Sequence, residues 1–110
     1  MTLKTFKSFI KTITDMEKRC EEFNAAMENA LSMPFNKDGY KNDSTCMFFF
    51  PLEGIQKLFI EALVNDFDES QEGAEWFVYE GIEQILKGGT EVNEQKIKTF
   101  EEYYNWLNNN

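Results

Sequence analysis

Histidine is absent from the 110 residues, and only two cysteines, Cys20 and Cys46, are present. The lack of histidine excludes Ser-His and Cys-His nucleophilic sites, His-bearing zinc sites and imidazole pH switches. Two cysteines are too few for a Cys-only zinc site within one chain. We expect each cysteine to be a small buried hydrophobe in a reducing cytoplasm. We also expect no metal, no cofactor and no enzymatic activity.

Long apolar runs are missing as well. No stretch reaches the roughly 18 apolar residues that a membrane-spanning helix needs. The N-terminal segment MTLKTFKSFIKTITDMEK has no apolar core of the kind found in secretory signal peptides. We therefore expect a cytoplasmic protein that does not interact with a membrane.

Acidic and aromatic residues are plentiful. The chain has 20 acids against 11 bases, a net charge of −9, and 15% aromatic residues including 11 Phe. Residues 1–20 carry a net charge of +3 and residues 51–86 a net charge of −8. This uneven distribution favours internal pairing, head-to-tail self-association or two different binding surfaces. The overall negative charge disfavours direct binding to nucleic acid.

The sequence predicts a mostly α-helical single domain with four helices, a long N-terminal helix and at most one small antiparallel sheet. Its length suits one domain. Pro51 favours a helix start, Gly88-Gly89 favours a helix stop, and Thr99 with Glu102 forms a capping box. The predicted helices are residues 3–31, 51–66, 70–87 and 99–108, with a loop at 32–50.

A heptad pattern of apolar residues runs along the first predicted helix. It comprises Phe6, Phe9, Ile13, Met16, Cys20, Phe23, Met27 and Ala30. One interpretation is a core helix whose lysines face solvent. The other is self-association: Phe6, Phe9, Ile13 and Met16 would meet a second copy in an antiparallel homodimer, with the lysine-rich start of one helix near Glu21, Glu22 and Glu28 of the other.

The helix predicted at 70–87 has an apolar arc and an acidic side. Val78, Tyr79, Ile82, Ile85 and Leu86 form the arc. Trp76 falls on the acidic side with Glu72, Glu80 and Glu83, so the helix either packs on two sides or exposes Trp76 among carboxylates. The expected core is Phe59, Leu63, Ile82, Leu86, Tyr103 and Leu107.

The segment Met47–Phe50 is predicted to be a short strand or a buried extended plug. Any small sheet would pair Phe48–Phe50 with residues 91–98, where the run Asn93-Glu94-Gln95-Lys96 between Val92 and Ile97 favours a small hairpin or a turn.

The C-terminal half also carries a recognisable pattern. The run Glu75–Glu80 (EWFVYE), then a glycine-containing turn, then Lys98–Leu107 (KTFEEYYNWL), resembles a group of small phage and prophage proteins with the pattern W-I-S-Y-F-I-Y-E … K-T-A-E-D-L-Y-D-F-L. Tyr79-Glu80 and the Thr99 cap match that pattern. Trp76 stands where the family has Tyr, and Gly73 stands where it has Trp, so the role of the family Trp does not carry over.

This resemblance implies a phage-encoded accessory protein in the cytoplasm of a bacterial host. Small acidic phage proteins often bind and block a host protein, including restriction and CRISPR nucleases. We therefore expect a non-enzymatic inhibitor of a host defence protein that mimics nucleic-acid charge and docks on a basic channel. The expected partner-binding residues are Glu61, Glu72, Trp76, Glu80 and Glu83. The alternative is a self-assembling structural or adaptor protein that uses the heptad pattern.

Overall fold

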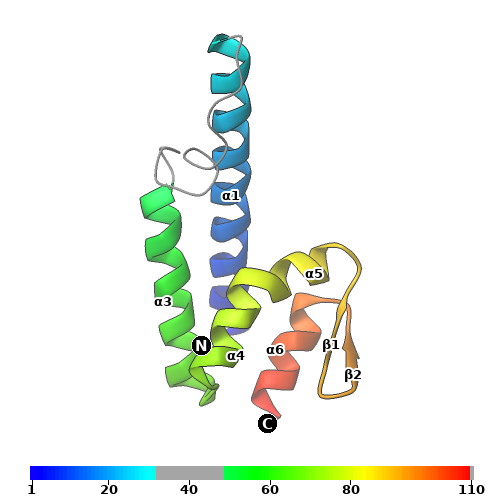
Figure 1. Ribbon diagram of the computed structural model, residues 1–110. Coiled ribbons are helices and arrows are strands. Elements are labelled where there is room, and N and C mark those ends of the chain that lie inside the picture. The colour runs from blue at the N-terminus through cyan, green and yellow to red at the C-terminus, as the bar shows by residue number, and fades with distance from the viewer. Residues whose placement is uncertain (32–48, 110) are drawn as a thin grey trace.

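The structure, a computed structural model, describes residues 1–31 and 49–109 (Figure 1). Over these residues the chain is mostly helical, with four helical stretches and one two-stranded antiparallel sheet, as predicted. The elements are α1 (Leu3–Leu31), α3 (Phe49–Phe67), α4 (Gln71–Trp76), η1 (Phe77–Gly81), α5 (Ile82–Leu86), β1 (Thr90–Val92), β2 (Gln95–Ile97) and α6 (Phe100–Asn108). The predicted loop lies outside the described residues, except that Phe49 and Phe50 already belong to α3.

Polar side chains fix the starts of two helices. The Ser70 hydroxyl accepts a hydrogen bond of 3.0 Å from the backbone N–H of Gly73 at the start of α4. The Thr99 hydroxyl accepts one of 3.1 Å from the N–H of Glu102 at the start of α6. The Glu102 carboxylate reaches back to the N–H of Lys98 at 3.2 Å. Both caps satisfy N–H groups that have no partner inside the helix, so these starts follow from sequence.

One continuous helix runs from Gln71 to Leu86 and contains a π-helical turn, η1, in its middle. The N–H of Ile82 bonds to the carbonyl of Phe77, five residues earlier. A Cβ built on Gly81 would lie 2.8 Å from Cδ1 of Phe77 and 3.1 Å from Cζ3 of Trp76. The missing side chain at Gly81 thus makes room for two aromatic rings against the wide turn. Such turns are rare and often occur at functional sites.

Two glycines end this helix and lead into the hairpin. Gly88 and Gly89 have φ angles of 130° and 135°, which side-chain-bearing residues rarely adopt. Asn93 and Glu94, with φ of 49° and 66°, form the turn between β1 and β2. Thr90 pairs with Ile97 in the antiparallel register. The predicted pairing of Phe48–Phe50 with this segment is wrong for Phe49 and Phe50, which are helical; Phe48 lies outside the described residues.

Aromatic rings from every helical stretch meet in the core. Phe6 of α1 lies 5.5 Å from Phe59 of α3 and 5.7 Å from Phe77 of η1, measured between ring centroids. Phe77 stacks on Tyr103 of α6 with centroids 4.0 Å apart. All four rings are buried, and burial raises the pKa of the Tyr103 hydroxyl. These rings hold the four helical stretches together.

The core prediction is correct at five positions and wrong at one. Phe59, Leu63, Ile82, Tyr103 and Leu107 are each less than 5% exposed. Leu86, at the end of α5, is 60% exposed. Leu86 does not belong to the side of the helix that faces the core. The buried side of the helix from Gln71 to Leu86 consists of Ala74, Phe77, Val78, Gly81, Ile82 and Ile85.

Burial along α1 decreases toward its C-terminal half. Ile10 and Ile13 are buried, whereas Met16 and Cys20 are only half-buried. Cys20 is disulfide-bonded, so the prediction of a free buried thiol is wrong for this residue. Cys20 lies past the part of α1 that the aromatic core surrounds, and its side chain is therefore only half-buried. Cys46 lies outside the described residues.

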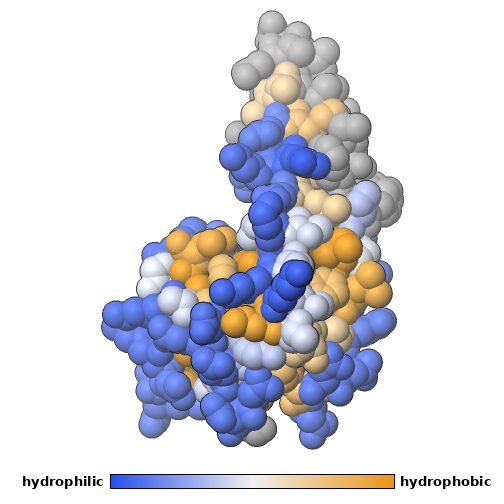
Figure 2. All heavy atoms as spheres, turned by 180° about the vertical axis from the view of Figure 1, so that it is seen from behind, coloured by the Kyte–Doolittle hydropathy of each residue, from blue (hydrophilic) through white to orange (hydrophobic). Residues whose placement is uncertain are grey.

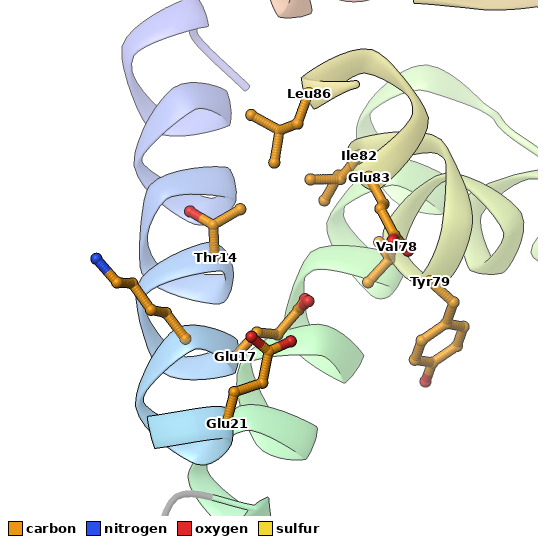
Figure 3. Close-up of a pocket in the computed structure, with 9 residues that line it drawn as sticks. Thr14, Glu17, Glu21, Val78, Tyr79, Ile82, Glu83 and Leu86 are labelled. Atoms are coloured by element: carbon orange, nitrogen blue, oxygen red, sulfur yellow. The ribbon is translucent and has the colours of Figure 1, made fainter. Parts of the chain in front are cut away.

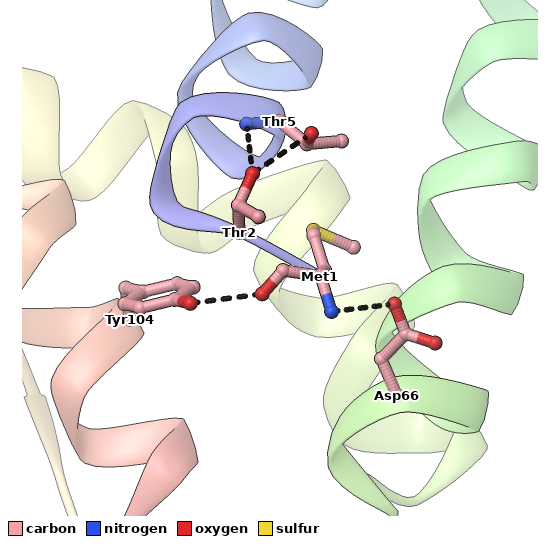
Figure 4. A network of polar contacts seen from close by, with 5 residues as sticks. All are labelled: Met1, Thr2, Thr5, Asp66 and Tyr104. Atoms are coloured by element: carbon pink, nitrogen blue, oxygen red, sulfur yellow. Dashed lines mark hydrogen bonds and ion pairs between the residues drawn. The ribbon is translucent and has the colours of Figure 1, made fainter.

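Polar contacts tie the start of α1 to two other helices (Figure 4). The Met1 amino group pairs with the Asp66 carboxylate of α3 at 3.0 Å. The Tyr104 hydroxyl of α6 donates a hydrogen bond of 2.8 Å to the Met1 carbonyl. The Thr2 hydroxyl accepts from the N–H of Thr5 at 3.1 Å and caps α1. These contacts fix the direction in which α1 leaves the core.

The lysines of α1 face solvent, as the first interpretation of its sequence predicts. Lys4, Lys7, Lys11 and Lys18 are all exposed. Figure 2 shows a hydrophilic column along α1 with hydrophobic groups on both sides of it. Lys11 pairs with Asp15 at 3.1 Å and Lys18 with Glu22 at 4.0 Å, so part of this basic charge is neutralised within α1.

Candidate functional site

Three of the five predicted partner-binding residues lie together on the outer side of α4 and η1. Glu72, Trp76 and Glu80 line a shallow depression of about 290 Å³ with two further residues, Glu75 and Tyr79. We call these five residues the aromatic–acidic patch. The residues recur every three or four positions, and such spacing brings side chains onto one face of a helix.

The other two predicted residues lie elsewhere. Glu61 is exposed on α3 and does not line the patch. Glu83 is exposed on α5 and lines a different cleft, next to α1. The tertiary structure therefore divides the predicted acidic surface into separate regions.

Trp76 combines the two roles that the sequence left open. It is half-buried and packs against the edge of the core, and its ring covers the position where a Gly81 side chain would stand. The same residue lines the aromatic–acidic patch. Trp76 therefore both packs against the core and leaves part of its indole at the surface of the patch.

Tyr79 belongs to the apolar arc of the sequence, but the structure exposes it. Its side chain is 51% exposed. The core-facing side of the helix includes Ala74, Phe77 and Gly81, which turns Tyr79 outward. The sequence did contain a signal for this position, because Tyr79 follows Trp76 by three residues and so shares its face.

Lysines neutralise some acidic residues of this region but not those of the patch. Lys57 pairs with Glu53 at 3.0 Å, and Lys87 pairs with Glu83 at 2.7 Å. Hydrogen bonding to these glutamates raises the pKa of both lysines. Among the residues that the structure describes, Glu72 and Glu80 have no ion pair. The patch therefore presents unneutralised negative charge beside exposed aromatic surface.

The four residues predicted for self-association differ in how far the chain covers them. Phe6 and Ile13 are fully buried, so neither can contact a second copy of the folded chain. Phe9 is half-buried and stacks on Phe59 of α3, with ring centroids 4.8 Å apart. Met16 is also half-buried. The first part of the heptad pattern thus packs on α3 and on the aromatic core, and Glu28 of the imagined dimer lies in a part of α1 whose side chains are not described.

The part of the chain that the structure describes holds neither a candidate metal site nor a candidate membrane span. Residues 1–31 and 49–109 contain no group of three or more acidic or cysteine side chains arranged to hold a metal ion. The same residues contain no helix that is long and apolar enough to span a membrane.

Comparison of the chain with protein-family models, with curated proteins and with solved structures finds no match. The likeness to phage proteins therefore remains an expectation drawn from the C-terminal half of the sequence.

Proposed function

We propose that this protein acts by binding a basic surface of another protein through the aromatic–acidic patch. The observation that carries the proposal is the combination of three exposed carboxylates, Glu72, Glu75 and Glu80, with the half-buried Trp76 and the exposed Tyr79. Carboxylates attract a cationic partner and speed its association. Aromatic side chains that are already held in place supply contact area at a low entropic cost.

The charge of the surroundings supports the same choice of partner. Residues 51–86 hold nine acids and a single base, Lys57, which is already paired with Glu53. A neutral or acidic partner would have to leave these carboxylates unpaired at the contact. A partner with exposed arginines or lysines would neutralise them, and the binding would weaken with added salt.

The resemblance to phage proteins supplies the partner class. We take the partner to be a host defence protein, such as a restriction or CRISPR nuclease with a basic nucleic-acid channel. The carboxylates would occupy that channel in place of phosphates and block it without catalysis. Mimicry of this kind requires negative charge at the contact, which the carboxylates of the patch supply.

The test is capture of partners from a bacterial host lysate, followed by titration of the captured protein at several salt concentrations. A variant of the aromatic–acidic patch with Glu72→Gln, Glu75→Gln and Glu80→Gln should fold normally, because exposed carboxylates contribute little to folding. It should bind more weakly, mainly through slower association, and with a flatter salt dependence.

The matched control changes three acids away from the patch, Glu91→Gln, Glu94→Gln and Glu101→Gln. Both variants lose the same charge, so equal weakening by both would show a general charge effect and exclude the patch. Trp76→Ala is the sharper probe: it should weaken binding by about 2 kcal/mol or more if the indole is an anchor. Normal binding by both Trp76→Ala and the patch variant would refute the proposal.

A further inference from the structure

A second cleft lies between α1 and the helix formed by η1 and α5 (Figure 3). Its volume is about 180 Å³. Glu17 and Glu21 extend into it from α1, while Val78, Ile82 and Leu86 face them from the opposite wall (Figure 3). The cleft is smaller than the roughly 300 Å³ at which pockets for small molecules begin, so it suits a single side chain.

The wall opposite α1 is apolar and partly open to solvent. Val78 and Ile82 are 2% and 3% exposed and form its inner part. Leu86 and Tyr79 are 60% and 51% exposed and form its outer edge. Large apolar side chains exposed next to a cleft mark a place where another molecule can bury them.

The α1 wall of the cleft carries two carboxylates, Glu17 and Glu21, with Lys18 between them in the sequence. Glu83 pairs with Lys87, and Lys18 pairs with Glu22. In the described part of the chain, no ion pair involves Glu17 or Glu21. Burial and the neighbouring carboxylates of Glu83 and Glu21 raise the pKa of Glu17. A cation in the cleft would relieve this repulsion.

We infer that the cleft receives one arginine or lysine side chain from an amphipathic segment of the protein partner. The aliphatic stem of that side chain would lie on Val78, Ile82 and Leu86, and its cationic head would pair with Glu17 and Glu21. Long basic side chains combine an apolar stem and a charged head in this way. Charge complementarity selects this occupant over a neutral or acidic one. The inference rests on the proposed function. It adds a second contact point beside the aromatic–acidic patch, because Tyr79 lines both the patch and the cleft.

The probe is a short amphipathic helical peptide of leucine and arginine, titrated against the full chain. The matched peptide carries citrulline in place of each arginine, which keeps the shape and removes the charge. The arginine peptide should bind, and the citrulline peptide should bind about tenfold more weakly or worse, because it loses the charge-assisted hydrogen bonds to the carboxylates.

Two pairs of variants locate the binding. Glu17→Gln with Glu21→Gln should weaken the arginine peptide about tenfold. The control, Glu91→Gln with Glu94→Gln, changes the net charge equally on the hairpin and should alter binding by about twofold or less. Leu86→Ala should also weaken binding, whereas Leu58→Ala, at the 55% exposed leucine of α3, should not. Thermal melts check that each variant is folded.

Each outcome decides the inference. Equal binding of the two peptides, or unchanged binding of the arginine peptide by the Glu17 and Glu21 variant, would overturn it. Equal losses in the cleft variant and the hairpin variant would overturn it as well, since the effect would then be general attraction. None of these results touches the proposed function, which depends on the separate titration of the Glu72, Glu80 and Trp76 variants with the captured partner.

Discussion

Replacing Phe6 with alanine separates a core role from the self-association that the heptad pattern also allowed. Phe6 is fully buried, and its ring centroid lies within 6.4 Å of those of Phe59, Phe77, Tyr103 and Tyr104. Truncating a buried Phe to Ala costs about 3–5 kcal/mol. This is a large part of the roughly 5–15 kcal/mol by which a domain is stable.

The loss is measurable as a lower melting temperature. For a domain of this size each kcal/mol corresponds to about 4 °C, so Phe6→Ala should melt about 12–20 °C below the unmodified chain. Circular dichroism during heating, together with urea unfolding, measures the change. Leu58→Ala is the control because that leucine is 55% exposed, and its melting temperature should stay close to that of the unmodified chain.

Light scattering on the same samples tests the competing explanation. If Phe6 packs inside the chain, the folded variant has the same mass as the unmodified protein. A Phe6→Ala protein that melts normally but has a lower mass at high concentration would refute the reasoning, because Phe6 would then contact a second copy.

Three further substitutions follow from local geometry. Gly54→Ala should stabilise α3 by up to about 1 kcal/mol, since no atom stands within 4 Å of the new Cβ. Gly81→Ala should destabilise the fold by about 1–3 kcal/mol, because its Cβ would lie 2.8 Å from the Phe77 ring. Denaturant unfolding measures both changes in the free energy of unfolding. Glu17→Gln should raise the melting temperature at pH 7 but not well below pH 4.5. Folding raises the pKa of the Glu17 carboxyl, so the folded state is destabilised as the pH rises and this carboxyl ionises. An equal effect of the substitution at both pH values would contradict this. Tyr104→Phe removes the 2.8 Å hydrogen bond to the Met1 carbonyl and should cost about 1 kcal/mol in thermal melts, an expectation that unchanged stability would contradict.

The helix boundaries and caps were predictable because they depend on neighbouring residues. Thr99 and Glu102 form the predicted capping contacts, and Gly88 and Gly89 adopt the predicted helix-ending conformation. The exposed lysine face of α1 was also predictable, because the spacing of the lysines along one helix places them on the same side. Glu72, Trp76 and Glu80 share a face through their spacing along one helix, so three of the five patch residues could be predicted from the sequence.

Other features required the packing of distant segments. The helical period could not show which side of the helix from Gln71 to Leu86 faces the core, because that depends on where Phe6 of α1 and Tyr103 of α6 pack against Phe77. Leu86 is therefore exposed although the sequence predicted it to be buried, and Tyr79 of the same apolar arc is exposed as well. The cleft at Glu17 joins residues about sixty positions apart, and no local pattern connects them. The sequence by itself determined the helices, their ends and the acidic face, since these are set within a few residues; only the tertiary structure decided which apolar residues are buried and which carboxylates meet, since both depend on contacts between elements far apart in the chain.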